Sequence, residues 1–194
     1  MMLRKLRVVM VRPGRDQLSG LVEVDETCVG GENPGKPGRG AEGKVIVAGA
    51  VDIRGKAANR IHLQVIPNVT GAALLGFIQN SIAPGSVILT ELGYSRVTEV
   101  GYKHTVLAEP PHMHRVFGNL KTWLIGTHHG VSPQHLQAYL NEYTFRFNRR
   151  GTPMAVFQTV LGLVKGRLGP TYEGIHGVKK GRKEWIHPTN LIMS

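Results

Sequence analysis

The chain has 194 residues, of which 24 are lysine or arginine and 13 are acidic, giving a formal net charge of +11. This basic excess indicates a polyanionic partner, usually nucleic acid, although some basic proteins have none. The only cysteine, Cys28, excludes an internal disulfide and any multi-cysteine zinc site within the chain. No apolar run approaches the roughly 20 residues of a membrane helix and no signal-peptide pattern is found, so the sequence predicts a cytoplasmic protein without a membrane partner.

Turn residues and charge divide the sequence into three parts. Residues 1–20 form a basic lead-in that ends in glycine-containing turns, residues 21–168 carry strand and helix patterns, and residues 169–194 form a glycine- and lysine-rich basic tail. The middle part is long enough to bury a core of its own. We therefore expect one domain over residues 21–168, flanked by two basic segments.

Three apolar segments near the start of this domain predict strands. They are residues 21–29, 44–53 and 60–67, each rich in valine, isoleucine or leucine. Short connections between consecutive strands favour an antiparallel meander.

The connection between the first two strands, residues 30–43, is rich in glycine and proline and predicts a loop. It carries Lys36 and Arg39, and Lys44 follows it. These cations are candidate contacts to DNA phosphates. An ordinary surface loop is the alternative, and the sequence leaves both open.

The first strand carries two acids on one face. Successive side chains of a strand point to opposite faces, so Val22 and Val24 face one way and Glu23 and Asp25 the other. A carboxylate on a buried strand needs a hydrogen bond, an ion pair or a metal ion. Asp25 is therefore either a metal ligand in the middle of a sheet or a solvated acid on an edge strand.

A helix and two further strands follow. Residues 70–82 have helical spacing, with Thr70 as the N-cap. Residues 86–90 predict a buried strand that ends on Glu91, and the strand–helix–strand connection places it parallel to an earlier strand. Residues 102–107 predict a fifth strand.

From Pro110 onward the pattern is helical. Apolar residues at three- and four-residue steps predict a helix that packs on the sheet and is broken by residues 126–130. Ser132 and Pro133 open a second helix, and residues 153–168 predict a third. The predicted buried stripe of the second helix is Leu136, Leu140, Tyr143 and Phe147.

Asp25 and Glu91 come from two strands that we expect to be neighbours, so their carboxylates converge on one site. Adjacent carboxylates repel each other unless a cation lies between them. A divalent metal ion is the usual solution, and Mg²⁺ takes oxygen ligands. Two such ions about 3.5–4 Å apart assist phosphodiester chemistry, which is the reaction that this pair indicates.

His114 and Lys121 are 7 residues apart and share a face of the first predicted helix, which is not its apolar face. A lone helical histidine is commonly an ordinary residue, so the spacing alone assigns no role. The histidines at 112, 114, 128 and 129 could mimic a zinc site. No cysteine or acidic partner lies at a standard spacing, which disfavours zinc.

A charged ridge is predicted on the second helix, where Glu142, Arg146 and Arg149 share a face. Glu142 and Arg146 make a routine intrahelical ion pair in the simplest interpretation. The functional alternative is a ridge that contacts the DNA backbone, and the neighbouring Arg150 also suits a phosphate contact.

Five segments together resemble the ISXO2-like transposases of bacterial insertion sequences. They are VEVDETCVGG (22–31), KVIVAGAVD (44–52), SVILTE with GYS (86–95), HMHRVFGNLKTWLIGTHHGVS (112–132) and HLQAYLNEYTFRFNRR (135–150). They run in family order. The resemblance implies an α/β domain of ribonuclease-H-like (RNase-H-like) fold, with a mixed sheet of about five strands, three antiparallel and then parallel ones, flanked by helices.

The resemblance also implies an activity: cutting and joining of DNA at transposon ends with Mg²⁺ or Mn²⁺. The family's site falls on Asp25, Glu91 and His114 as metal ligands, with Lys121 two helical turns further along as a catalytic residue. The Glu142, Arg146 and Arg149 ridge is a family mark too. The implied partners are transposon terminal repeats and target DNA, bound by a homo-oligomer in a synaptic complex.

Departures from the family pattern predict a truncated or decaying copy. Glu91 stands where relatives usually have Asp, and a different turn follows it. The connection between Leu107 and Pro110 is short, and the chain starts where the family's catalytic domain starts. Glu is one methylene longer than Asp, so either the site is impaired or the altered turn compensates. A catalytically inactive DNA-binding remnant is the alternative to an active transposase.

Overall fold

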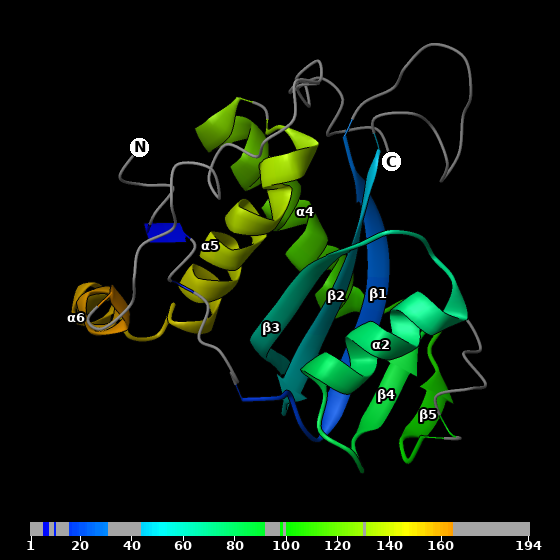
Figure 1. Cartoon of the computed structure of the whole chain (residues 1–194). Coiled ribbons are helices and arrows are strands. Elements are labelled where there is room, and N and C mark those ends of the chain that lie inside the picture. Colours follow the sequence, from blue (N-terminus) through cyan, green and yellow to red (C-terminus); the bar gives the residue numbers. More distant parts are fainter. Residues whose placement is uncertain are drawn as a thin grey trace.

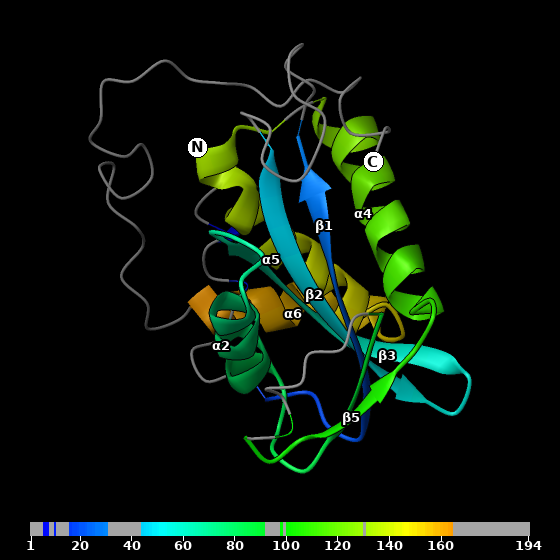
Figure 2. The same ribbon diagram turned by 90° about the vertical axis from the view of Figure 1, so that its right-hand side faces the viewer.

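The computed structural model describes residues 6, 7, 10, 16–30, 44–91, 98, 100–129 and 131–164, apart from the side chains of residues 161, 163 and 164. Within this part a mixed sheet lies between helices on its two faces (Figures 1 and 2). The predicted loop residues 31–43, most of the lead-in and the tail residues 169–194 lie outside the described residues.

The sheet has five strands in the order β3-β2-β1-β4-β5. β1 (Leu21–Val29), β2 (Val45–Arg54) and β3 (Ala57–Ile66) form the predicted antiparallel meander. β4 (Val87–Thr90) pairs parallel with β1, and β5 (Lys103–Val106) pairs parallel with β4. The predicted RNase-H-like α/β class is confirmed, with β1 at the centre of the sheet.

One helix forms the crossover between β3 and β4, and another follows β5. α2 (Gly71–Ser81) begins at the predicted N-cap, where the Thr70 hydroxyl accepts a hydrogen bond from the Ala73 N–H. α4 (Pro111–His128) ends within the predicted break at residues 126–130, and its C-cap residue His129 has a left-handed φ of 51°. Gly126 itself is still helical, since a single glycine costs a helix only about 1 kcal/mol.

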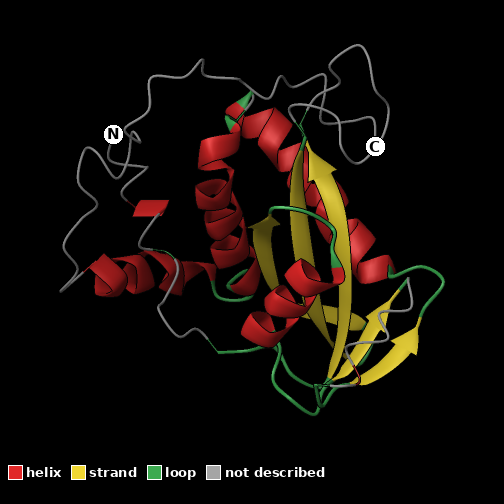
Figure 3. Cartoon of the chain, turned by 45° about the vertical axis from the view of Figure 1, so that its right-hand side comes forward, coloured by secondary structure: helices red, strands yellow, loops and turns green. Residues whose placement is uncertain are grey.

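The chain after α4 forms a short 3₁₀ turn, η1 (Pro133–His135), followed by α5 (Leu136–Asn148) and α6 (Pro153–Val164). Ser132 precedes η1, but its side chain makes no capping hydrogen bond. α6 lies beyond α5, away from the strands (Figure 3). Among the described residues, none of these helices is long and apolar enough to span a bilayer.

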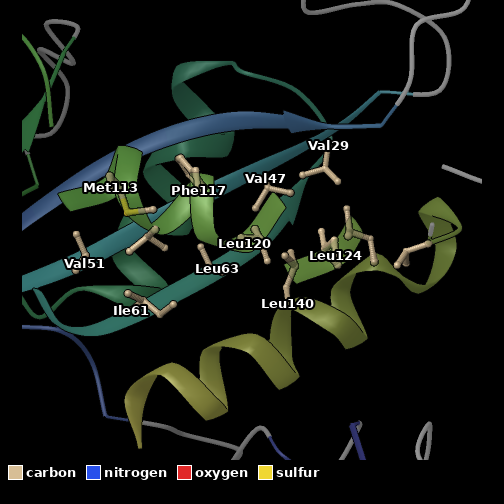
Figure 4. Close-up of a cluster of buried hydrophobic side chains, with 13 residues drawn as sticks. Val29, Val47, Val51, Ile61, Leu63, Met113, Phe117, Leu120, Leu124 and Leu140 are labelled. Carbon is tan, nitrogen blue, oxygen red and sulfur yellow. The ribbon is translucent and has the colours of Figure 1, made fainter. Parts of the chain in front are cut away.

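The sheet buries a separate hydrophobic cluster on each face. On one face, Val22 and Val24 of β1 pack with Leu74 and Phe77 of α2. On the other face, α4 and α5 cover β2 and β3 with the cluster drawn in Figure 4, which includes Val47, Val51, Ile61, Leu63, Met113, Phe117, Leu120, Leu124 and Leu140. The acids of β1 alternate with its valines and face α4, as the strand periodicity predicted.

The burial of α5 differs in part from the predicted stripe. Leu136 and Leu140 are fully buried, but Tyr143 and Phe147 are only partly buried. Phe145, which the spacing left out, is 3% exposed. α5 contacts both α4 and β3, so it is covered from more than one side and a single apolar stripe does not describe it.

Side-chain amides of α5 bind the outer edge of β3. The Asn148 Oδ1 accepts from the Ile61 N–H at 2.7 Å, and its Nδ2 donates to the Ile61 carbonyl at 3.0 Å. Gln137 accepts from the Val65 N–H at 2.8 Å and donates to the Leu63 carbonyl at 3.3 Å. These paired contacts fix α5 along the edge strand.

Candidate active site

Three predicted site residues meet at one place beside the centre of the sheet. Asp25 lies on β1, Glu91 follows β4, and His114 lies in the first turns of α4. The His114 Nε2 is 3.4 Å from the Asp25 Oδ2 and 3.2 Å from the Glu91 Oε1. The imidazole thus contacts both carboxylates.

Strand pairing explains why the two acids come together. In the parallel ladder of β1 and β4, Leu21 pairs with Val87 and Glu23 with Leu89. Continuing this register by two residues brings Asp25 level with Glu91. The sequence prediction that the two strands are neighbours is therefore confirmed, and the acids are separated by 66 residues in sequence but adjacent in space.

Asp25 is the more buried of the two acids, with a side chain 15% exposed against 39% for Glu91. The Asp25 Oδ1 accepts a hydrogen bond from the Glu26 N–H at 2.7 Å. Burial raises the pKa of Asp25 from 3.8 to about 6, partly offset by this hydrogen bond. Holding the Asp25 carboxylate ionised at this place is therefore costly without a nearby positive charge.

A glycine lets α4 approach the sheet beside Asp25. Gly49 pairs with Asp25 across β1 and β2. A Cβ atom at Gly49 would lie 2.4 Å from the Met113 Cε and 2.8 Å from the Phe117 Cζ, closer than real contacts allow. The absence of a side chain at this position thus leaves room for the Met113 and Phe117 side chains between the sheet and the helix that carries His114.

The acid that precedes Asp25 on the same face, Glu23, was not assigned a role from the sequence. Its side chain is 2% exposed and lies 2.7 Å from the His112 Nδ1, while the His112 Nε2 lies 3.3 Å from the Lys56 carbonyl oxygen. The hydrogen bond to Glu23 raises the pKa of His112. The signal available in the sequence was a second inward-facing acid on a buried strand.

Lys121 lies on α4 two turns after His114 and is half-buried. Burial lowers the pKa of the Lys121 ammonium, an interaction with Cys28 opposes this, and the Lys44 ammonium lowers the pKa further. The structure therefore brings Lys44, predicted as a DNA contact, near Lys121. The other two predicted loop cations, Lys36 and Arg39, lie outside the described residues.

The predicted ridge on α5 is held by contacts within the chain. The Glu142 Oε2 accepts from the Arg7 Nε at 2.5 Å, and its Oε1 lies 3.5 Å from Arg146, the predicted i,i+4 partner. Arg7 comes from the lead-in, so this part of the lead-in packs on α5. Arg146 remains exposed, with 59% of its side chain accessible.

Arg149, which ends the ridge, and the neighbouring Arg150 differ in their surroundings. The Arg149 guanidinium lies 4.0 Å from the Phe145 ring centroid. Arg150 donates to the carbonyls of Ala58, Asn59 and Phe147, so it holds the edge of β3. Contact of either arginine with DNA stays a prediction.

The donor set of the Asp25, Glu91 and His114 cluster suits a divalent ion, because carboxylate oxygens and an imidazole nitrogen are common metal ligands. In the described part of the chain, however, no group of three or more His, Cys, Asp or Glu side chains is already arranged around a metal position. The His114 Nε2 lies between the two carboxylates, 3.4 Å from the Asp25 Oδ2 and 3.2 Å from the Glu91 Oε1. The alternative zinc site gains no support, because His128 packs between the Trp123 and Tyr139 rings.

Comparisons with known proteins give one family. No curated protein matches this chain. A chain in the cryoEM structure of the simian T-cell lymphotropic virus intasome in complex with PP2A regulatory subunit B56 gamma is similar, at 13% identity and a TM-score of 0.42. That match covers 69% of this chain and 51% of the other, so this chain spans about half the length of that relative. A family model described as the ISXO2-like transposase domain matches residues 17–148.

Proposed function

Since this chain belongs to the ISXO2-like transposase domain family, we propose that it is the catalytic domain of an insertion-sequence transposase that cleaves DNA and transfers strands at transposon ends. The observation that carries the proposal is the meeting of Asp25, Glu91 and His114 at 3.2 and 3.4 Å. We take the catalytic domain to be residues 21–168, with a basic segment on each side, and we expect it to act in the cytoplasm.

Each residue of the cluster has a distinct task in this proposal. Asp25 and Glu91, with His114, would hold Mg²⁺ or Mn²⁺, and the imidazole favours Mn²⁺. Such an ion supplies activation of the attacking oxygen and stabilisation of the leaving oxygen. Lys121 presents a half-buried ammonium on the same helix, where a DNA phosphate would replace its lost hydration.

Binding of DNA follows from charge. The net charge of +11 supports a salt-sensitive and largely sequence-independent affinity. Exposed Arg146, together with Lys44, Arg149, Arg150 and the loop cations Lys36 and Arg39, would contact the DNA backbone, while Glu142 orients Arg146. The partners are then terminal repeats and target DNA, held by a homo-oligomer in a synaptic complex.

A second function is favoured by one departure from the family pattern. Glu91 stands where relatives usually have Asp, and the longer side chain changes the reach of one candidate metal ligand. A copy that binds DNA without cutting it would show the same charge and the same fold.

A nicking assay distinguishes the two functions. Supercoiled plasmid is incubated with the full chain and with Mg²⁺, Mn²⁺ or EDTA, beside Asp25→Ala and the surface control Asp16→Ala, whose side chain is 88% exposed. Metal-dependent nicking that is lost only in Asp25→Ala supports the transposase. Salt-sensitive binding without nicking, equal in all three proteins, supports the DNA-binding remnant.

A further inference from the structure

The helix that carries His114 begins without a cap of its own. Pro110 occupies the N-cap position of α4 and offers no side-chain hydrogen bond, and the first turn contains no acid. The first N–H groups of a helix have no partner within the helix, and buried ones need another acceptor. α2 solves the same problem locally with the Thr70 hydroxyl.

Glu23 supplies the missing cap from the neighbouring strand. Its Oε2 accepts the backbone N–H groups of both His112 and Met113, each at 2.9 Å. Its Oε1 lies 2.7 Å from the His112 Nδ1. A carboxylate at this end of an 18-residue helix is also favoured by the helix dipole.

The hydrogen bonds of Glu23 leave it little capacity to bind a metal ion. Both oxygens have partners, and the side chain is 2% exposed. The His112 ring extends the contact, because its Nε2 lies 3.3 Å from the Lys56 carbonyl in the β2–β3 hairpin. Glu23 therefore joins β1, the start of α4 and the hairpin at one buried point.

This point and the candidate active site share two elements, β1 and α4. Asp25 lies two residues after Glu23 on the same face of β1, and His114 lies two residues after His112 on α4. The contact of the His114 Nε2 with Asp25 thus depends on where the first turn of α4 sits relative to β1.

We propose that Glu23 is a positioning residue, whose carboxylate caps the first turn of α4 and thereby holds His114 opposite Asp25 and Glu91. The proposal rests on the proposed function, since it takes that cluster to be the reacting centre. Glu23 itself touches neither of the two other acids in this role and acts through the helix.

Three substitutions of Glu23 separate the effect of its side-chain length from the effect of its charge. Glu23→Ala removes the cap. Glu23→Gln keeps its length: the amide oxygen accepts the two N–H groups, and the amide NH₂ donates to an unprotonated His112 Nδ1. Glu23→Asp keeps the charge but is one methylene too short. If Glu23 positions α4, the Gln variant should keep amide protection and Mn²⁺ affinity better than the Asp variant. If only the negative charge of Glu23 matters, the Asp variant should keep them better.

Asp52→Ala is the matched control. Asp52 is a buried strand carboxylate of 1% exposure, and it accepts a backbone N–H, from Arg60, as Glu23 does from α4. It lies on β2 and bonds the hairpin instead of α4. Removing the Asp52 carboxylate tests whether the loss of any buried carboxylate from this sheet changes the first turn of α4 as the loss of Glu23 does.

The first measurement needs no activity. Amide hydrogen exchange and histidine side-chain NMR spectra are recorded on the full chain. In Glu23→Ala and Glu23→Asp we expect the His112 and Met113 amides to exchange about tenfold faster or more relative to amides of β2, and the His114 ring resonances to move. Glu23→Gln and Asp52→Ala should leave both as in the unaltered chain.

The second measurement is Mn²⁺ affinity by calorimetry. We expect the dissociation constant to rise about tenfold in Glu23→Ala and Glu23→Asp and to stay within about twofold in Glu23→Gln, as for outer groups that orient a ligand. Unchanged His114 resonances in Glu23→Asp, or equal changes in Asp52→Ala, overturn the proposal. If Glu23→Ala does not fold, the comparison of the Gln and Asp variants tests the positioning role. If the unaltered chain neither binds Mn²⁺ nor nicks DNA, the proposed function fails, while the exchange and resonance data still judge Glu23.

Discussion

Asp25→Asn tests whether the candidate site is built at the expense of stability. Burial raises the pKa of the Asp25 carboxyl from 3.8 to about 6. Each pKa unit corresponds to about 1.36 kcal/mol, so the ionised form costs the folded chain at most about 3 kcal/mol. The side chain is 15% exposed, and solvent screening reduces the expected figure to about 1–2 kcal/mol.

The direction in which stability changes with pH follows from proton linkage. The folded state holds the Asp25 proton more tightly than the unfolded state, so stability falls as pH rises between the two pKa values. The cost is absent below pH 3.8 and complete above about pH 6. Asn is neutral and keeps an oxygen to accept the Glu26 N–H. The variant should therefore be more stable than the unaltered chain at pH 7.5, and the difference should vanish near pH 4.

Urea titrations in EDTA at several pH values measure this difference. Adding Mn²⁺ should then reverse the order, because a ligand that binds only the folded state stabilises it and the variant lacks a metal ligand. A gain in the stability of Asp25→Asn that does not depend on pH, or a loss of stability at pH 7.5, would refute the argument that burial of the Asp25 charge destabilises the folded chain.

Three further predictions concern Glu91, Gly49 and the buried side chains of α5. The Glu91 Oε1 lies 3.2 Å from the His114 imidazole, and Glu91→Asp withdraws the carboxylate by about 1.5 Å. The variant should therefore lower Mn²⁺-dependent nicking. An increase in nicking would mean that the glutamate impairs the site. Gly49→Ala should cost about 1–3 kcal/mol in urea titrations and weaken Mn²⁺ binding, because the new methyl group overlaps the Met113 and Phe117 side chains that pack α4 on the sheet. Its control, Gly76→Ala in α2, meets open space and should stabilise the helix. Leu140→Ala should cost about 2–5 kcal/mol and Phe147→Ala less, and the reverse order would mean that α5 is misplaced.

The strands and the position of the two acids could be predicted because they depend on local patterns. Alternation placed Asp25 on the face opposite Val22 and Val24, and the strand–helix–strand connection made β4 parallel to β1. These rules act over a few residues or through the handedness of the chain. They were enough to bring Asp25 and Glu91 to neighbouring strands.

The features that the sequence did not predict depend on contacts between distant segments. The Glu23 cap joins residues 89 and 90 positions apart, and no local pattern marks its partner. Gly49 looks like any strand glycine until α4 is packed against it. Phe145 is buried although it lies off the predicted apolar stripe, and the Arg149 guanidinium 4.0 Å from its ring centroid is a contact that apolar periodicity does not mark.

The amide contacts along β3 have a consequence for assembly. An edge strand normally offers a row of free N–H and C=O groups to which a strand of another molecule can add. Here Asn148 occupies both backbone groups of Ile61, and Gln137 occupies Leu63 and Val65, so α5 imitates a sixth strand along that edge. Copies of this chain are thereby kept from joining sheet to sheet through β3, and an ordered assembly would form through other surfaces.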